Sequence, residues 1–492
     1  MEKFIVNPAY EMRQDGNRVV IASRGLLDPD IYDYAEHYSY IHPINAQMLS
    51  FFNGDDDLGT VIDKISHHFN IPTNKTKEIV EKYIENNEKF TTPSKAGSQS
   101  FPYKTIVKKG NFKNYKVYKT TDFVHTDTPD FMTFRAVIPT NLNIQLTMKC
   151  YTDCIYCYAN RKMNIIKPLS FDKIIETIRE ARRIGIIDLM INGGEVLLHP
   201  QYKEIILEMI KCGYEPYIST KVPLTQSIVN NLAEIGLKRI QISLDTVNPN
   251  LLKKMVNVNL DYLKLMEASI QRLQNAGIKI MIHTIVTSVN SDLNEMEKLL
   301  EFVSKYETIK SVKFTAVGPS LYKSPENHQQ LKPTNKYLRE LSEWCKNKKE
   351  KYPDLKIIAP GEWSEEDFRD PIKFNKRSFC SANTIGMVIL PDGRVTVCEE
   401  LYEDPRFIIG DINDNSLLEI WQSEKAKKLL YLKQEDFPDD SPCKKCKSFN
   451  NCRYKAGVCW KFIFETYGED KFYYPDPRCP ESPEYKYKIF YE

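Results

Sequence analysis

The sequence has little net charge, no long apolar run and no cysteine in the first 149 of its 492 residues. Lys and Arg number 68 against 66 Asp and Glu, so the net charge is +2, which excludes a molecule-wide positive field for nucleic acid. No stretch of about 18 apolar residues, the length of a membrane-spanning helix, is present, and residues 1–16 lack the apolar core of a secretory signal. We therefore predict a cytoplasmic protein that binds neither nucleic acid nor a membrane.

The 12 cysteines that do occur are unevenly distributed. Three lie at 150–157 and seven between 380 and 479, while Cys212 and Cys345 stand alone. A reducing compartment and a chain of this length argue against a disulfide scaffold. Clustering at short spacings is instead typical of metal or iron–sulfur ligation. We expect Cys212 and Cys345, each near or within a helix, to be structural.

Residues 1–91 are predicted to form a small α+β domain. A turn at Gln14–Asn17 between two runs suited to strands indicates a hairpin over residues 10–23. Apolar residues at helical spacing after the hairpin indicate three helices. They start near Pro43, near Leu58 and after an Asn74 cap.

The next segment, residues 92–135, has a different composition. Its first part, 92–121, holds seven lysines and no Asp or Glu. This composition predicts a basic linker, which is either a solvated tether or a contact for an acidic partner.

From about residue 140 short apolar runs alternate with amphipathic segments of helical length. The runs suited to strands are residues 142–146, 188–192, 215–220, 239–243, 279–286 and 311–316. The first helix is expected over 170–184, with Ser170 as its cap. Six strand–helix units in succession predict parallel strands that close into a whole or partial barrel, with the chemistry on the loops after the strands.

The first of these strands leads directly into Cys150-x3-Cys154-x2-Cys157. Three thiolates in a tight loop can hold three irons of a cubane cluster and leave the fourth iron open to a small molecule. A structural zinc site is the alternative, but zinc takes four ligands and no fourth lies nearby in the sequence. Spacing and position therefore favour an iron–sulfur cluster.

Over residues 141–319 the sequence resembles the radical S-adenosylmethionine (SAM) superfamily, with Tyr156 before the last cysteine of the motif. The resemblance implies that SAM is reduced by the cluster and yields a 5′-deoxyadenosyl radical. Further residues match SAM-binding positions of the family, each after a predicted strand. They are Gly193, Gly194 and Glu195 for the methionine amino group, Ser219 and Lys221 for polar groups, Ser243 and Asp245 for the ribose, and 284–287 for the adenine.

The second field of cysteines resembles the SPASM domain, which carries two auxiliary [4Fe-4S] clusters. By that resemblance Cys443, Cys446, Cys452 and Cys479 hold the distal cluster, whereas Cys380, Cys398 and Cys459 hold the cluster nearer the barrel. Six residues precede Cys459 where three are commoner, and the near cluster has only three evident ligands. A zinc ribbon over 443–459 is the alternative. Three cubane clusters, about twelve irons per chain, are expected.

Glu399 follows Cys398 directly. In the related sulfatase-maturing enzymes an Asp after the matching cysteine acts as a base, so the resemblance makes Glu399 a candidate general base. The alternative is a surface carboxylate beside Glu400.

The N-terminal domain resembles the PqqD-like peptide-recognition domain of ribosomal-peptide maturases, in which a leader peptide adds a strand to the sheet. A DNA-binding winged helix is the alternative, but its recognition helix would be basic. Residues 76–88 instead mix two lysines with four glutamates.

Together these features predict an α/β enzyme with a partial (β/α)6 TIM-like barrel. The expected parts are a PqqD-like, winged helix–turn–helix-like domain 1–91, a linker 92–135, a radical SAM barrel 136–320, a bridging segment 321–379 and a SPASM domain 380–492. The resemblance implies a ribosomal precursor peptide with a leader sequence as partner and a flavodoxin- or ferredoxin-type electron donor.

The expected reaction is an intramolecular crosslink, first a cysteine thioether of the sactionine or ranthionine type. The alternatives are carbon–carbon or ether crosslinks of aromatic side chains, maturation of a sulfatase or quinone cofactor, and a non-enzymatic electron-transfer or regulatory protein. An electron carrier needs no SAM pocket, so the Gly193–Glu195 and Ser243/Asp245 motifs argue against the last of these.

Overall fold

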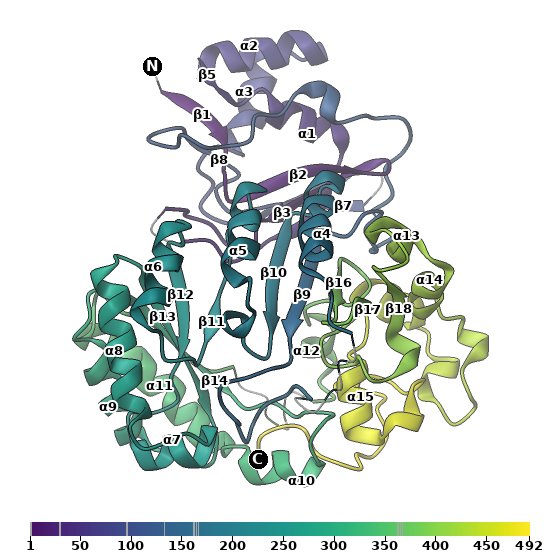
Figure 1. Cartoon of the computed structure of the whole chain (residues 1–492). Coiled ribbons are helices and arrows are strands. Elements are labelled where there is room, and N and C mark those ends of the chain that lie inside the picture. The colour runs from purple at the N-terminus through teal and green to yellow at the C-terminus, as the bar shows by residue number, and fades with distance from the viewer. Residues whose placement is uncertain are drawn as a thin grey trace. The chain divides into compact units, whose positions relative to one another are not determined.

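The computed structural model describes residues 2–28, 31–94, 97–131, 133–160, 163, 165, 167–361, 364, 366 and 368–492. The chain divides into two compact units (Figure 1). The first comprises Met1–Leu142 and Arg179–Leu189, and the second comprises Asn143–Ile178 and Met190–Glu492. In the part of the chain so described, no helix combines the length and the apolarity needed to cross a bilayer.

The first unit contains two three-stranded antiparallel sheets. In one, β1 (Lys3–Val6) lies between β5 (Asn53–Asp57) and β8 (Ile106–Lys108). In the other, β3 (Arg18–Ser23) lies between β2 (Tyr10–Asp15) and β4 (Tyr38–Ile41). The predicted hairpin over residues 10–23 is therefore confirmed, and Gly16 in its turn has the positive φ of 68° that a tight turn requires.

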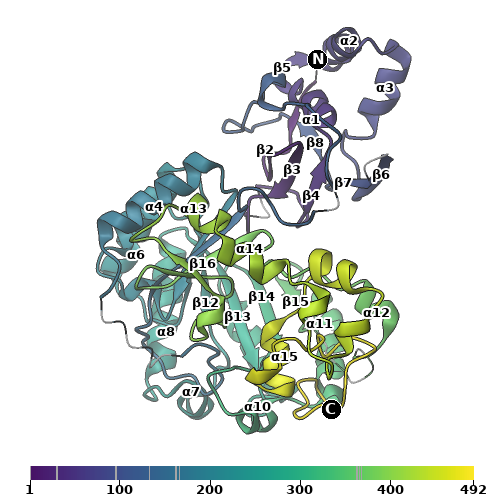
Figure 2. The same ribbon diagram turned by 90° about the vertical axis from the view of Figure 1, so that its right-hand side faces the viewer.

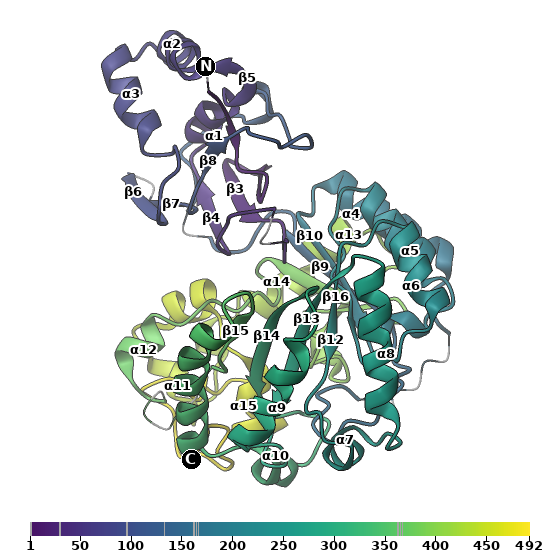
Figure 3. The same cartoon turned by 90° about the vertical axis from the view of Figure 1, so that its left-hand side faces the viewer.

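Three helices pack with these sheets around a common apolar core. They are α1 (Pro43–Ser50), α2 (Leu58–Phe69) and α3 (Thr73–Glu81), and Figures 2 and 3 both show α2 beside α3. The amide of Thr60 donates to the Asp57 carboxylate at 3.0 Å, which caps α2. The prediction of Asn74 as the cap of the third helix is wrong, because α3 already begins at Thr73 and Pro72 precedes it.

Residues 92–135 form part of this unit, in contrast to the linker that their composition predicts. β6 (Phe90–Ser94) pairs with β7 (Gly97–Phe101), and β8 completes the first sheet. Phe101, Ile106, Tyr118 and Phe123 are buried in the core of the first unit. The lysines that suggest a tether lie between these apolar anchors, so charge composition alone conceals the folded state of the segment.

A buried charge network holds the hairpin within the first unit. The Asp15 carboxylate, which is fully buried, lies 3.2 Å from Arg13 and 3.3 Å from Arg18 and accepts the amide of Val137 at 3.0 Å. Arg13 in turn donates to the carbonyl oxygens of Pro139 and Gly185 at 3.0 and 2.8 Å. Because each buried charge is paired and hydrogen-bonded, its desolvation cost is offset.

All six strands predicted from the barrel pattern are present. They are β9 (Asn141–Thr147), β10 (Asp188–Gly193), β11 (Ser219–Thr220), β12 (Arg239–Ser243), β13 (Lys279–Val286) and β14 (Ile309–Ala316). Strands β11 to β14 are parallel, and β15 (Lys356–Ile358) continues the sheet beyond β14. β11 is shorter than predicted, since Pro216 has no amide hydrogen to donate to a ladder. β9 and β10 belong to another sheet, so the mixed α/β fold is an open barrel.

Helices separate the strands as the sequence pattern predicts. They are α4 (Phe171–Ile184), α5 (Tyr202–Lys211), α6 (Gln226–Glu234), α7 (Pro249–Val256), α8 (Tyr262–Asn275), α9 (Leu293–Val303), α10 (Pro325–Leu331), α11 (Asn335–Lys351) and α12 (Pro371–Asn375). The Ser170 hydroxyl accepts the amide of Lys173 at 3.2 Å, which confirms Ser170 as a cap. Figure 3 shows α8, α9 and α11 on the outer side of β12 to β15.

The cysteine-rich end joins the barrel through the sheet. β16 (Gly386–Ile389), β17 (Arg394–Thr396) and β18 (Ile408–Asp411) form an antiparallel meander, and β16 is hydrogen-bonded beside β9. Helices α13 (Leu417–Gln422), α14 (Glu424–Leu430) and α15 (Trp460–Tyr467) follow, on the side opposite α8 and α9 (Figure 1). Since β17 runs back from the hairpin, Cys398 and Glu399 lie just beyond its end.

Candidate active site

A cavity of about 520 Å³ lies in the second unit, at the carboxyl ends of the barrel strands. Most of the site residues predicted from the radical SAM motifs line it, but Asp245 does not, and of residues 284–287 only Ile285 does. Those present are Cys150, Cys154, Cys157, Gly193, Gly194, Glu195, Ser219, Lys221 and Ser243, together with Glu399. Residues from five strand ends therefore meet in one space, as chemistry on an α/β barrel requires.

The loop that carries the three cysteines is hydrogen-bonded to the C-terminal end of α7. The amides of Asp153 and Ile155 donate to the carbonyl oxygens of Val256 and Met255 at 3.0 and 2.9 Å. The Thr152 hydroxyl lies 3.3 Å from the Cys154 sulfur. These bonds fix the loop backbone, so the three thiols face the cavity without depending on side-chain packing alone.

Two glycines allow the second strand to approach this loop closely. Gly193 has a φ of 127°, and a Cβ atom there would overlap the carbonyl oxygen of Thr147. At Gly194 a Cβ would overlap the carbonyl oxygen of Lys149 and lie 2.6 Å from that of Met148. The Gly194 amide donates to the Thr147 carbonyl oxygen at 2.6 Å. No residue with a side chain fits at either position without moving the cysteine loop.

Glu195 is buried behind the two glycines, with 3% of its surface exposed. Its carboxylate accepts the amides of Lys221 at 3.2 Å and Leu197 at 3.4 Å. Burial raises the pKa of Glu195 to about 7, although these hydrogen bonds act in the opposite direction. A cation bound in the cavity would favour the ionised form.

Asp245, one of the two residues expected to bind the ribose, does not line the cavity. It is 1% exposed and lies behind the wall, where it forms a 3.2 Å ion pair with Lys221 and accepts the hydroxyl of Tyr156. The amide of Ile285 donates to its other oxygen at 2.9 Å. In this structure Asp245 positions Lys221 and Tyr156 and does not face the cavity.

Several polar residues in the cavity were missed by the sequence analysis. Gln241 on β12 donates to Ser219 at 2.6 Å and to Ser243 at 3.2 Å, which links the ends of β11 and β12. His283 on β13 lies 2.9 Å from the Thr315 hydroxyl, and burial lowers its pKa to about 4, so it is neutral. The signal that could have found both is a polar residue at an inward position of an apolar strand.

Glu399 reaches the cavity from the C-terminal domain. One of its carboxylate oxygens accepts hydrogen bonds from three side chains. The donors are the side-chain amide of Asn192 at 2.9 Å, the side-chain amide of Asn143 at 3.4 Å and the hydroxyl of Tyr158 at 3.4 Å. The amide oxygens of Asn143 and Asn192 are buried and have no hydrogen-bond partner within the described part of the chain. Buried unpartnered oxygens are uncommon in proteins, and they provide acceptors for a polar ligand.

A second acidic group lies beside Glu399. Glu400 and Lys461 line the cavity and form a 2.6 Å ion pair. Burial raises the pKa of Glu400, and it raises the pKa of Glu465, one helical turn from Lys461, to about 7. One lysine therefore faces two carboxyl groups, and at neutral pH at least part of the Glu465 population holds a proton.

The structure places the seven cysteines between 380 and 479 in two groups, one of three and one of four. Burial and the neighbouring Cys380 and Cys459 thiols raise the pKa of Cys398. Burial, with smaller contributions from Cys452, Cys443 and Cys446, raises the pKa of Cys479 to about 12. We refer to Cys380, Cys398 and Cys459 as the near group and to Cys443, Cys446, Cys452 and Cys479 as the distal group.

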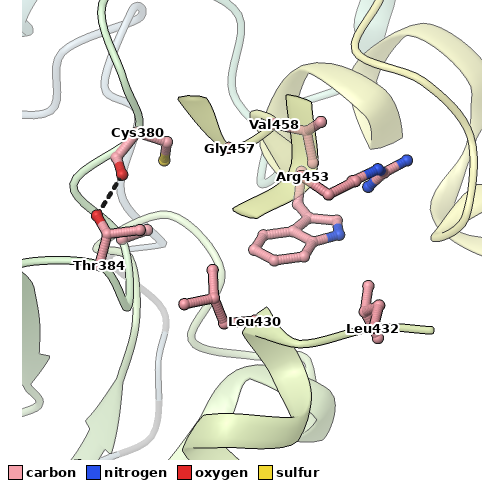
Figure 4. Close-up of a pocket in the computed structure, with 9 residues that line it drawn as sticks. Cys380, Thr384, Leu430, Leu432, Arg453, Gly457 and Val458 are labelled. Carbon is pink, nitrogen blue, oxygen red and sulfur yellow. Dashed lines mark hydrogen bonds between the residues drawn. The ribbon is translucent and has the colours of Figure 1, made fainter. Parts of the chain in front are cut away.

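Gly457 permits the approach of the near group. A Cβ at Gly457 would lie 3.2 Å from the Cβ of Cys380, whose amide donates to the carbonyl oxygen of Ala456 at 2.9 Å. Figure 4 shows Cys380 and Arg453 on opposite sides of a small cavity of about 10 Å³, with the Thr384 hydroxyl bonded to the Cys380 carbonyl oxygen. Cys345 is buried on α11 and Cys212 ends α5, so neither lies on an element of the C-terminal domain.

The donor sets fit iron–sulfur clusters. Across the described residues no three His, Cys, Asp or Glu side chains converge as ligands of a single metal ion. A cubane cluster needs a wider arrangement, because each of its irons takes its own thiolate. Three thiols around an open cavity, and separate groups of three and four, agree with that requirement.

Two family models match the chain. The Radical SAM superfamily matches residues 144–303, and the SPASM iron-sulfur cluster-binding domain matches residues 380–447. With the three thiols and the Gly-Gly-Glu wall of the cavity, these matches define an enzyme that binds an iron–sulfur cluster and SAM. The chain therefore contains a radical SAM domain, which is followed by a SPASM domain.

Similar proteins come from both structure and sequence. The structure of Streptococcus suis SuiB bound to S-adenosylmethionine has a TM-score of 0.62 at 14% identity and covers 97% of this chain and 99% of that chain. SuiB bound to the precursor peptide SuiA has a TM-score of 0.61, also at 14% identity, covering 97% of this chain and all of that chain. The PqqA peptide cyclase of Rhizobium meliloti is 23% identical over 71% of this chain and 89% of its own length. At these identities the likeness to the solved structures establishes the fold.

Substitution of Gly194 by Ala is expected to displace the cysteine loop. The added Cβ meets two backbone carbonyl oxygens, which cannot rotate away as a side chain could. We expect 5′-deoxyadenosine formation by the reduced enzyme to fall by about 100-fold or more, as for other small displacements in active sites. Gly361→Ala, whose Cβ would meet nothing within 4 Å, is the control. Equal activity of the two variants would contradict the packing argument.

SAM affinity is expected to depend on pH through Glu195. Below a pKa of about 7 the carboxyl group is protonated and cannot pair with the ammonium of SAM. Affinity should therefore rise several-fold between about pH 6 and pH 7.5, as the ionised fraction grows. Anaerobic calorimetry measures the change, and Glu195→Gln should abolish it. His283 stays neutral over this range and does not contribute. A pH dependence that persists in Glu195→Gln would exclude this residue as its source.

Proposed function

We propose that this enzyme forms an intramolecular crosslink in a ribosomally synthesised precursor peptide. The observation that carries the proposal is the common cavity that holds the three-cysteine loop and Glu399. A radical generated beside the three-cysteine loop can act on a substrate residue, and Glu399 can take a proton from that substrate. The coverage of the whole chain by SuiB, which has been solved with a precursor peptide, and the likeness to a peptide cyclase support a peptide substrate.

Each wall of the cavity has a proposed role. Cys150, Cys154 and Cys157 hold the cluster, Glu195 pairs with the SAM ammonium, and Ser219, Lys221 and Ser243 bind its other polar groups. When bound, cluster and SAM supply a 5′-deoxyadenosyl radical that abstracts a hydrogen atom. Asp245 and Tyr156 keep Lys221 in place from behind the wall.

Glu399 is the proposed general base. Two asparagine amides and one tyrosine hydroxyl converge on its carboxylate, so its orientation is fixed before a substrate binds. The neighbouring pair of Glu400 and Lys461 offers a path by which a proton taken up by Glu399 can leave the site.

The bond formed is proposed to be a thioether between a substrate cysteine and a carbon atom. The near group has three cysteines, and Cys345 and Cys212 lie on α11 and α5, outside the C-terminal domain. A substrate thiol that completes the near group would lose its proton on binding. A carbon–sulfur bond then requires removal of one hydrogen atom by the radical, one proton by Glu399 and one electron by the C-terminal clusters, so atoms and electrons balance.

The first unit is the proposed leader-binding module. Its order of a hairpin followed by a helix–turn–helix pair is that of a PqqD-like domain, and both of its three-stranded sheets end in strands that could pair with an added peptide strand. Capture of the leader would raise the effective concentration of the core peptide at the cavity. A flavodoxin- or ferredoxin-type protein is the proposed source of electrons, and three [4Fe-4S] clusters are the proposed complement.

The test is to incubate the reconstituted, reduced enzyme with the precursor encoded by a neighbouring short reading frame. We expect a product lighter by two hydrogen atoms, with the new bond located by fragmentation in mass spectrometry. Replacing the precursor cysteine by Ser should abolish the product. A product that persists after that replacement indicates a carbon–carbon or ether bond instead. A precursor that lacks its leader should react at least about tenfold more slowly, as expected for loss of a tether.

Glu399→Gln is expected to affect crosslink formation but not SAM cleavage. SAM cleavage should stay within about twofold of wild type, while the crosslinked product falls by about 100-fold, the usual contribution of a general base. Glu403→Gln, a nearby exposed carboxylate, is the matched control. A Glu399→Gln enzyme that forms product at the wild-type rate would rule out Glu399 as the base.

A further inference from the structure

Arg453 is a buried cation without a carboxylate partner. Arg453 is 4% exposed. It forms no ion pair with Asp or Glu among the residues that the structure describes. Its Nη2 donates to the Cys443 sulfur at 3.2 Å and to the Tyr474 carbonyl oxygen at 2.7 Å. Its Nε and Nη1 are buried without a hydrogen-bond acceptor. The ring of Phe437 lies 5.0 Å from its Cζ and excludes water.

Arg377 makes a similar contact from another segment. Its Nη2 donates to the Cys452 sulfur at 3.2 Å and to the Gly457 carbonyl oxygen at 3.0 Å. Its Nη1 donates to the Phe374 carbonyl oxygen at 2.7 Å, while its Nε has no acceptor. Both arginines thus point a guanidinium edge at sulfur atoms of the distal group.

A buried charge without a counter-charge is costly, and proteins almost always pair it. Among the described residues around Arg453 no carboxylate pairs with it, and the Cys443 sulfur is the group that can carry a negative charge. Four thiolates bound to a cubane cluster carry net negative charge, which grows by one unit on reduction. Hydrogen bonds to the sulfurs and nearby positive charge raise the reduction potential of such clusters.

The near group differs in this respect. Asp476, which is fully buried, accepts two 2.8 Å hydrogen bonds from Arg478 and the amide of Cys459 at 3.0 Å. The arginine next to the near group is therefore already neutralised by a carboxylate. Of the arginines that contact the two groups in the described part of the chain, Arg453 and Arg377 are the ones without a carboxylate partner.

We propose that Arg453 and Arg377 are the counter-charges of the cluster held by the distal group and that they favour its reduced state. This proposal rests on the cluster assignment made under the proposed function. Reduction adds one electron and no proton, so the added charge is balanced by guanidinium groups already in place. No bond forms or breaks. The two arginines act on the cluster as an electron acceptor and not on the substrate, since neither lines the large cavity.

The test is a potentiometric titration of the full-length reconstituted enzyme, followed by electron paramagnetic resonance. The signal of the distal cluster is identified by its loss in Cys446→Ala. In Arg453→Gln and Arg377→Gln we expect the midpoint potential of that signal alone to fall, by about tenfold in the reduction equilibrium constant, which is about 59 mV for one electron. Arg453→Lys keeps the charge and should shift it less. Arg394→Gln, which removes an arginine paired with Asp392, is the control.

Iron content separates this proposal from the cluster assignment. Full iron with an unshifted potential in both Gln variants would overturn the role of the arginines and leave the cluster in place. An equal shift in Arg394→Gln would also overturn it. If Arg453→Gln fails to bind iron at the distal group, the Arg377→Gln variant decides, because Arg377 is only half-buried, and an unshifted potential in that variant counts against the proposal. Crosslink formation is measured separately, so its failure is distinguishable from either result.

Discussion

The site depends on the contact between the backbone at Gly193–Gly194 and the backbone that leads into the cysteine loop. Carbonyl oxygens of Thr147, Met148 and Lys149 occupy the space that side chains at the two glycines would need. This contact sets the distance between the three thiols and the carboxyl end of the second strand. The bonds from the loop to Val256 and Met255 fix its other side. The cysteine loop is therefore fixed by the glycines on one side and by α7 on the other, and the other groups of the cavity lie around it.

The second determinant is the strand β16, which adds the C-terminal domain to the barrel sheet beside β9. Because β17 returns antiparallel from the hairpin, its end brings Glu399 to the amides of Asn143 and Asn192. A residue 256 positions away in sequence from Asn143 thus shares one cavity with it. The chemistry assigned to Glu399 follows from this hydrogen-bonded geometry and not from the order of domains.

Local patterns in the sequence were sufficient to predict the barrel strands, the Ser170 cap, the hairpin over residues 10–23 and most residues of the cavity wall. Each depends on spacing or on turn chemistry over a few residues. What could not be predicted depends on contacts between distant residues. Gln241 and His283 look like ordinary strand positions until neighbouring strand ends meet, and Asp245 matches a ligand-binding motif although it lies behind the wall. The lysines of 92–121 concealed apolar anchors at Phe101 and Ile106 that complete the core of the first unit.

The pairing of β16 with β9 also bears on how such chains can be cut and recombined. Residue 380 marks the start of the matched SPASM domain, so the C-terminal part resembles a module that could be removed or exchanged. Its first strand, however, covers the edge of β9. A chain shortened at this boundary would expose the edge of β9, a strand that is largely buried in the whole chain, and unpaired strand edges associate with other chains and cause aggregation. The barrel is therefore soluble on its own only if another strand replaces β16.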